Sequence, residues 1–165
     1  MLWAPWRTNY VENISQITEC FLCEAVKQPR EKWREFLLLY RGQRAFVIFN
    51  KYPYNAGHLM VTPIEHTGDM LSLDDLTALE IHKLTKACIK ALQACLKPHG
   101  FNLGYNLGRS AGAGLEDHLH LHVVPRWNGD TNFMPVLSET KVISQDLYEL
   151  YDRIKPIFES VVNVT

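Results

Sequence analysis

The stretch His118-Leu119-His120-Leu121-His122-Val123-Val124-Pro125-Arg126 alternates histidine with aliphatic residues. In a β-strand, successive side chains point to opposite faces of the sheet and rise about 3.3 Å per residue. The sequence therefore predicts His118, His120 and His122 on one face, each about 6.6 Å from the next, with the aliphatic side chains facing the core. A purely structural role would require partners for both ring nitrogens of every imidazole. The pattern therefore favours a functional site.

Two kinds of chemistry use histidines in this arrangement. A metallohydrolase can take two alternate histidines as zinc ligands. Alternatively, one imidazole is a nucleophile toward phosphorus while its neighbours orient it and supply charge. Neutral imidazole is a good nucleophile near pH 7, and the phosphoramidate that it forms is labile enough for a second nucleophile to resolve. The spacing alone leaves both possibilities open.

A loop of small residues, Gly108-Arg109-Ser110-Ala111-Gly112-Ala113-Gly114, leads directly into the histidine strand. Glycine permits close approach of the backbone, and successive N–H groups can form a nest for an anion. The loop is therefore either a phosphate cradle beside His120 or a mobile connection between strands. The sequence contains no P-loop pattern and no Rossmann glycine fingerprint after a strand, which excludes those two phosphate-binding classes.

The rest of the chain has the periodicity of a sheet combined with helices. Apolar, β-rich runs predict strands over 36–40, 45–49, 58–62 and 101–107, and a fifth strand through the histidines. Apolar residues at three- and four-residue spacing predict a long helix that opens at a capping box, Ser72-Leu73-Asp74-Asp75, and ends near Lys97-Pro98. A last helix is expected over 146–158. This order predicts an α+β fold, an antiparallel five-stranded sheet with the long helix packed on it and a C-terminal helix.

Length and composition predict one domain over residues 1–165, with an N-terminal arm at 1–17, a core at 18–130 and a C-terminal extension with a helix at 131–165. The net charge of −1 predicts no nucleic-acid partner, because no broad basic surface is available. No apolar run is long enough to span a membrane, and the first residues lack the apolar core of a signal peptide. We therefore expect a cytoplasmic protein without a membrane partner.

The four cysteines fall into two pairs. Cys88 and Cys95 share a face of the long helix about 10 Å apart along its axis, too far for a disulfide, and are expected in the core. Cys20 and Cys23 form a C-x-x-C pair, for which we expect a short surrounding helix. The pair is only half of a tetrahedral zinc site, and two buried reduced thiols are the alternative. A redox pair is disfavoured, because no strand is predicted before it in a βαβ unit.

The histidine motif, His-Leu-His-Leu-His-Val-Val, resembles that of the histidine-triad family, in which histidines alternate with hydrophobic residues and two hydrophobic residues follow. The resemblance covers about residues 18–130. Its further motifs are the blocks 50–53, 57–61 and 63–66, together with Pro125-Arg126 and Gly129-Asp130. Residues 2–7 and 132–135 are similar to a bacterial branch described as diadenosine tetraphosphate phosphorylases or hydrolases.

The resemblance implies specific roles on the histidine strand. His120, the middle histidine, would be the nucleophile that attacks the α-phosphorus and forms a nucleotidyl-histidine. His122 would contact phosphate oxygens or the bridging oxygen and favour the development of charge there. His118 completes the catalytic set.

The resemblance also implies contacts with the nucleotide. Asn50 would hold the ribose hydroxyls, Asn106 would position the phosphate or the nucleophile, and His58 would line the site and support the imidazole network. Phe46 and Ile48 are expected either as walls for the base or as ordinary core residues.

One departure from the family pattern concerns the loop before the triad. Family members often have Gly-Gln-[Ser/Thr] there, whereas this chain has Gly112-Ala113-Gly114. Backbone amides at Gly112 and Gly114, or the side chains of Ser110 and Arg109, are expected to replace the missing phosphate contacts. Glu116 would lie on the histidine face if the strand extends back that far.

A structural zinc ion (Zn²⁺) is also implied by the resemblance. Some family members, and the related galactose-1-phosphate uridylyltransferases, bind zinc through C-x-x-C, the histidine after the third strand and the first triad histidine. The matching positions are Cys20, Cys23, His66 and His118. Such a site would tie the N-terminal segment to the catalytic strand and leave His120 free, whereas without a metal His66 would be a capping residue.

Together these features predict a nucleotide-processing enzyme. It would cleave dinucleoside polyphosphates such as diadenosine tetraphosphate at the α-phosphorus, through a nucleotidyl-histidine resolved by phosphate or water. The alternatives are an adenosine phosphoramidate hydrolase of the same family, a hydrolase whose triad holds a catalytic zinc, and a nucleotide-binding protein with little catalysis. The resemblance further implies a homodimer paired through the long helix and the sheet, with added contacts from the N-terminal arm and 133–136.

Overall fold

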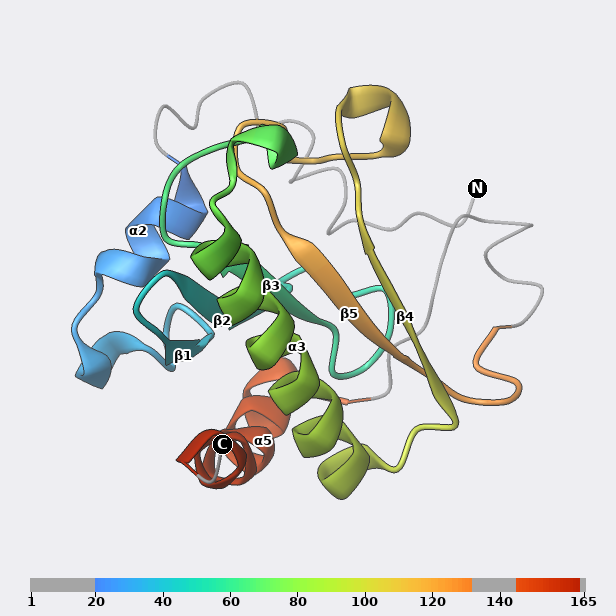
Figure 1. Cartoon of the computed structure of the whole chain (residues 1–165). Coiled ribbons are helices and arrows are strands. Elements are labelled where there is room, and N and C mark those ends of the chain that lie inside the picture. The colour runs from blue at the N-terminus through green and yellow to red at the C-terminus, as the bar shows by residue number, and fades with distance from the viewer. Residues whose placement is uncertain (1–19, 132–144, 164–165) are drawn as a thin grey trace.

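The computed structural model describes residues 20–131 and 145–163 (Figure 1). The predicted arm at 1–17 and the apolar segment 133–136 lie outside the described residues. The strands are β1 (Leu38–Arg41), β2 (Ala45–Phe49), β3 (Leu59–Pro63), β4 (Gly100–Tyr105) and β5 (Leu121–Arg126). The helices are α2 (Phe21–Lys27), α3 (Asp75–Leu96) and α5 (Leu147–Asn163), with short 3₁₀ turns η2 (Arg30–Lys32), η3 (Met70–Ser72) and η4 (Arg109–Ala111).

The strands form one antiparallel sheet in the order β1-β2-β3-β5-β4. This confirms the predicted α+β class and the five-stranded sheet. The histidine strand β5 is internal, between β3 and β4, and Figure 1 shows it running beside β4 along most of its length. His122 pairs with Met60 on one side and with Gly104 on the other, so its position in the sheet is fixed from both sides.

The sheet is the middle layer of the fold. α3 and α5 pack on one face, where the larger apolar cluster includes Val47 and Phe49 of β2. α2 packs on the other face, where a second cluster contains Phe46 and Ile48 of the same strand. Every residue of β2 is buried because both of its faces are covered. Met60 belongs to the second cluster, and its partner across the strands is His122, so the histidine face is turned away from α3.

The start of the long helix differs from the prediction. The capping box at Ser72 is wrong, because Ser72 ends the turn η3 and its hydroxyl donates to the carbonyl of Asp69. Asp74 is the N-cap instead, and its carboxylate accepts from the backbone amides of Leu76 and Thr77. The predicted end is confirmed, since Lys97 terminates the helix in a left-handed conformation with φ of 49°.

The histidine strand also begins later than predicted. Regular pairing starts at Leu121, so His118 and His120 precede the strand. The register would place Leu119 opposite Pro63, which has no N–H to donate to the ladder. Leu119 instead donates its own N–H to the carbonyl of Thr67 and accepts from the hydroxyl of Thr62.

Three smaller predictions can be judged in the described residues. A short helix does surround the cysteine pair, with Cys20 at its N-cap and Cys23 in its first turn. Cys88 is fully buried and Cys95 packs against the same cluster, as expected. The last helix continues beyond Phe158 to Asn163. Among the described residues, none of the helices combines the length and the apolar character needed to cross a bilayer.

Candidate functional site

The three triad histidines divide between two environments. The rings of His120 and His122 are neighbours, with centroids 4.9 Å apart in an edge-to-face arrangement. The ring of His118 lies instead against His66, at 5.1 Å, and against Phe46, at 6.4 Å. The alternation therefore predicted that His120 and His122 are neighbours, whereas His118, which precedes β5, has separate partners.

The imidazole of His120 has a defined tautomer. Its Nδ1 lies 2.8 Å from the carbonyl oxygen of His118. A carbonyl only accepts hydrogen bonds, so Nδ1 carries the proton and the lone pair resides on Nε2. A neutral imidazole with its Nε2 lone pair available is the form required of a nucleophile.

A second hydrogen-bonded path fixes the tautomers of His58 and His122. The backbone N–H of Tyr54 donates to Nδ1 of His58 at 3.0 Å. The proton of a neutral His58 is therefore on Nε2, which lies 2.9 Å from Nδ1 of His122 and donates to it. His122 in turn carries its own proton on Nε2, and the side-chain amide of Asn106 lies 3.4 Å from that nitrogen.

Both members of this pair are neutral near pH 7. Burial, reinforced by His122 and His120, lowers the pKa of His58 from its ordinary 6.5 to about 3. Burial and the neighbouring His120 lower the pKa of His122 to about 4. The pair can therefore donate and accept hydrogen bonds without adding positive charge to the buried site.

These pKa shifts predict a loss of stability in mild acid. Each group takes up a proton in the unfolded state below about pH 6.5 but stays neutral in the fold until pH falls to about 3 for His58 and about 4 for His122. The free energy of unfolding should therefore fall between pH 6.5 and 4, by up to roughly 1.4 kcal/mol per pH unit for each group. Urea denaturation at pH 7, 6 and 5 measures this slope.

A variant comparison isolates the contribution of His58. His58→Asn removes one titrating group and should reduce the slope, whereas His82→Asn, on the exposed face of α3, should leave the slope unchanged. Equal slopes in the wild type and in His58→Asn would contradict the assignment.

Two of the predicted nucleotide-binding side chains, Asn50 and Asn106, lie next to the imidazoles. The amide nitrogen of Asn50 is 3.4 Å from Nδ1 of His58, and its oxygen accepts from the backbone N–H of Tyr52. Asn106 adjoins His122, and a Cβ added to Gly112 would lie 3.9 Å from the amide nitrogen of Asn106.

Two other predicted residues of the glycine-rich loop are exposed. Ser110 lies on the exposed turn η4, and Gly114 is exposed beyond it. Their contact with phosphate stays a prediction. Glu116 does not extend the histidine strand, because it is exposed in the loop and a Cβ on Gly68 would collide with its carbonyl oxygen.

One aromatic residue of the site is absent from the sequence-based set. The ring of Tyr54 packs on His58 with centroids 4.7 Å apart and on His122 at 5.5 Å, while 45% of the residue stays exposed. Tyr54 therefore forms the outer cover of the His58–His122 pair. Its only sequence signal is its position in the turn that precedes His58. Phe46 and Ile48, considered as walls for the base, are buried in the second core cluster instead.

A cluster of metal-binding atoms lies beside this site. One ligand atom from each of Cys20, Cys23, His66 and His118 falls within 4.8 Å of all the others, as predicted. Sγ of Cys20 and Nδ1 of His118 are 3.3 Å apart, as are Sγ of Cys23 and Nδ1 of His66, and the two Nδ1 atoms.

The three separations of 3.3 Å are close to the edges of a tetrahedral zinc site. Zinc–nitrogen bonds of about 2.05 Å and zinc–sulfur bonds of about 2.3 Å imply edges of about 3.3 Å between two nitrogens and about 3.6 Å between nitrogen and sulfur. Nε2 of His118 lies 2.9 Å from the carbonyl of Pro63 and donates to it, which leaves the Nδ1 lone pair for a metal. A set of four protein ligands is typical of structural zinc. It also disfavours a catalytic metal held jointly by the triad, because His118 is directed toward the cysteines.

Comparison with known proteins gives consistent matches. Residues 34–129 match the family model described as HIT domain. The AP-4-A phosphorylase of Mycobacterium tuberculosis (strain H37Rv) is 40% identical over 149 residues, which cover 87% of this chain and 76% of that protein. A hypothetical histidine triad nucleotide-binding protein from Sulfolobus tokodaii superposes with a TM-score of 0.66 at 31% identity, covering 88% of this chain and 93% of that one. A zinc-bound histidine triad family protein from Mycobacterium smegmatis superposes with a TM-score of 0.68 at 25% identity, covering 89% and 98%.

Proposed function

We propose that this chain, which belongs to the HIT domain family, is an enzyme that cleaves dinucleoside polyphosphates such as diadenosine tetraphosphate. The observation that carries the proposal is the pair of tautomers set by the fold. His120 has its lone pair on Nε2, and the adjacent His122 has its proton on Nε2. A nucleophile and a hydrogen-bond donor for the leaving oxygen are thus side by side. The match to an AP-4-A phosphorylase supports this substrate class.

The proposed reaction proceeds in two displacements at the α-phosphorus. Nε2 of His120 forms a bond to phosphorus, and the bond from phosphorus to the bridging oxygen breaks with its electron pair on the leaving nucleotide. The Nε2–H of His122 donates to that oxygen as its negative charge develops. The carbonyl of His118 accepts from Nδ1 of His120 and stabilises the positive imidazole ring of the nucleotidyl-histidine. Phosphate or water then attacks the same phosphorus and releases His120.

Substrate contacts are proposed for the polar residues around the imidazoles. Asn50 would bind the ribose hydroxyls, and Asn106 would hold an α-phosphate oxygen next to His122. The amides of Gly112 and Gly114 and the hydroxyl of Ser110 would contact the phosphate chain, which is anionic and suits an exposed, glycine-rich loop.

The metal site would be structural. Cys20, Cys23, His66 and His118 fit zinc by donor type and separation, and a zinc-bound relative of the same fold supports that choice of metal. When bound, zinc would supply cross-linking rather than Lewis-acid chemistry at the substrate. It would tie α2 and the segment after β3 to the start of the histidine strand.

A homodimer is proposed as well. The edge strand β4 exposes Leu103, which is 48% accessible, and α3 exposes Leu76 and Leu79. A strand edge that no other described strand pairs with, and exposed leucines on a helix, are each typical of surfaces that contact another chain. Light scattering at micromolar concentration should give twice the mass of the chain, and a monomer would contradict the proposal.

The decisive experiment for the function is a product assay with diadenosine tetraphosphate, with and without inorganic phosphate. Formation of ADP and ATP only in the presence of phosphate is expected of a phosphorylase, because phosphate then resolves the nucleotidyl-histidine. AMP and ATP in both conditions would indicate a hydrolase. Absence of cleavage would contradict the proposed substrate class, and an adenosine phosphoramidate would be the next substrate to test.

A further inference from the structure

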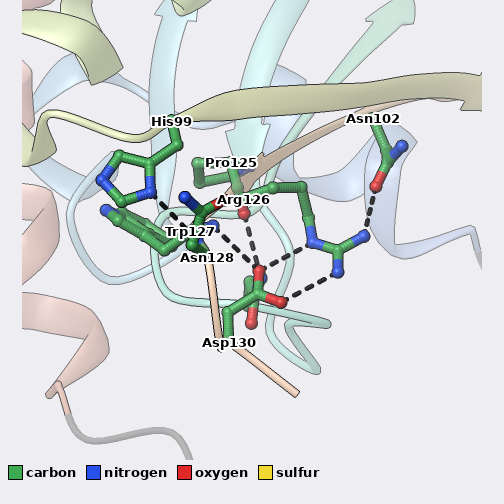
Figure 2. Close-up of polar contacts among 8 residues, drawn as sticks. His99, Asn102, Pro125, Arg126, Trp127, Asn128 and Asp130 are labelled. Carbon is green, nitrogen blue, oxygen red and sulfur yellow. Dashed lines mark hydrogen bonds and ion pairs between the residues drawn. The ribbon is translucent and has the colours of Figure 1, made fainter.

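A network of polar contacts closes the far end of the histidine strand (Figure 2). The carboxylate of Asp130 accepts from Nε of Arg126 at 2.7 Å and from its Nη2 at 2.8 Å, in a two-pronged ion pair. It also accepts from the backbone N–H of Trp127 at 3.1 Å. Arg126 reaches β4 as well, because its Nη1 donates to the side chain of Asn102. The side chain of Asp130 is only 9% exposed, so its carboxylate is enclosed by these contacts, whereas the side chain of Arg126 is 41% exposed.

Among the residues that the structure describes, Asp130 has one hydrogen-bond partner outside residues 126–130, and that partner leads toward the candidate site. Nδ2 of Asn55 donates to Oδ2 of Asp130 at 2.6 Å and to the carbonyl of Pro125 at 3.0 Å. Asn55 is 6% exposed, and its backbone carbonyl accepts from the N–H of His58. The side chain of Asn55 therefore anchors the turn that delivers His58 to the site.

The turn from Tyr54 to His58 also packs tightly against α3. Gly57 has φ of 77°, a left-handed conformation, and a Cβ there would lie 2.7 Å from Leu96 and 3.0 Å from Leu92 of α3. The turn therefore has little freedom against α3, while Asn55 fixes it against the end of β5. The residue before Asn55 is Tyr54, whose backbone N–H meets Nδ1 of His58.

We propose that Asp130 is a positioning residue that keeps the proton of His58 on Nε2, acting through Asn55 and the turn from Tyr54 to His58. The consequence for catalysis rests on the proposed function. If the Tyr54 N–H were withdrawn, the amide of Asn50 would remain near Nδ1 at the longer distance of 3.4 Å, and His58 could hold its proton on Nδ1 and accept from His122 through Nε2. His122 would then carry its proton on Nδ1 and have none on Nε2 for the leaving oxygen.

The test is Asp130→Asn in the full chain. Asparagine has the same size as aspartate, but its amide N–H would face the N–H groups that now donate to the carboxylate. The matched control is Asp152→Asn, since Asp152 accepts from Nε and Nη2 of Arg34 in the same two-pronged geometry, both at 2.8 Å, on the exposed side of α5. The nitrogen chemical shifts of ¹⁵N-labelled histidine report which ring nitrogen is protonated. The wild type and the control should show His58 protonated on Nε2, and Asp130→Asn should show a mixture or the other tautomer.

Kinetics supply a second readout. We expect Asp130→Asn to lower kcat by about ten- to a hundredfold with KM changed less than about twofold, because the donor to the leaving oxygen is lost while the nucleotide contacts remain. Asn55→Ala breaks the same path but leaves the ion pair between Asp130 and Arg126 in place. This variant supplies the test if Asp130→Asn does not fold. It should show the same change in tautomer, and the double variant should be no worse than either single one.

The outcomes separate this inference from the proposed function. Unchanged histidine shifts and unchanged kcat in a folded Asp130→Asn or Asn55→Ala would overturn the positioning role. A changed tautomer in a protein whose wild type cleaves no dinucleoside polyphosphate would uphold the role of Asp130 and reject only the substrate class.

Discussion

Replacing His120 by asparagine is expected to lower the cleavage of diadenosine tetraphosphate by roughly a thousandfold or more. The reason is that asparagine has no nitrogen lone pair that can attack phosphorus, so the first displacement cannot occur. The side-chain amide can still donate to the carbonyl of His118, the partner of Nδ1 in the wild type, so the fold should persist. The measurements are the rate of nucleotide formation and the thermal unfolding midpoint of the same preparation.

Two further observations make this result specific. His82→Asn, the same exchange on the exposed face of α3, should keep full activity. Mass spectrometry of the wild type quenched during turnover should detect a nucleotidyl adduct, and this adduct should be absent from His120→Asn. Full activity of His120→Asn would refute the covalent mechanism, whatever the fate of the substrate assignment.

Replacing Cys23 by serine is expected to remove zinc and to lower the melting temperature by about 10 °C. Loss of one thiolate leaves three ligands and weakens zinc binding. When free zinc is at a thousand times its dissociation constant, zinc binding stabilises the folded state by about 4 kcal/mol. For a chain of this size, each kcal/mol shifts the midpoint by about 2–4 °C. The measurements are metal content by mass spectrometry and thermal unfolding followed by circular dichroism.

The control for the metal site is Cys95→Ser, on α3 and remote from the ligand cluster in sequence and packing. It should retain one zinc per chain. Retention of a full complement of zinc by Cys23→Ser, or a wild type that binds none in the presence of added zinc, would contradict the assignment.

The sequence was a good guide to the fold because its main signals are local. The continuous apolar runs of β2 and β3 reflect burial on both faces, and the three- and four-residue spacing in α3 reflects burial on one face. The element boundaries were less predictable. Asp74 rather than Ser72 caps α3 because the choice between nearby carboxylates and hydroxyls depends on where the preceding turn leads the chain. The late start of β5 depends on Pro63, a residue of a different strand.

The sequence predicted several of the residues that surround the imidazoles, but it missed Tyr54 and did not predict their contacts. The comparison with a family motif supplied His58, Asn50 and Asn106, and the structure brings all three next to the imidazoles. No local pattern indicates that the backbone N–H of Tyr54 sets the tautomer of His58, because backbone groups have no sequence signature. The link from Asp130 to Asn55 joins residues 75 positions apart and becomes visible only once the sheet is assembled.

The cluster of Cys20, Cys23, His66 and His118 also bears on the stage of folding at which His120 gains its final surroundings. Cys20 and His118 are 98 positions apart, and contacts between such distant residues form late because closure of a long loop first costs chain entropy. The carbonyl that holds the Nδ1 proton of His120 belongs to the same His118. We therefore expect a chain still emerging from the ribosome to contain the histidine segment without a competent nucleophile. On the proposed function, cleavage of dinucleoside polyphosphates would begin only when folding is nearly complete.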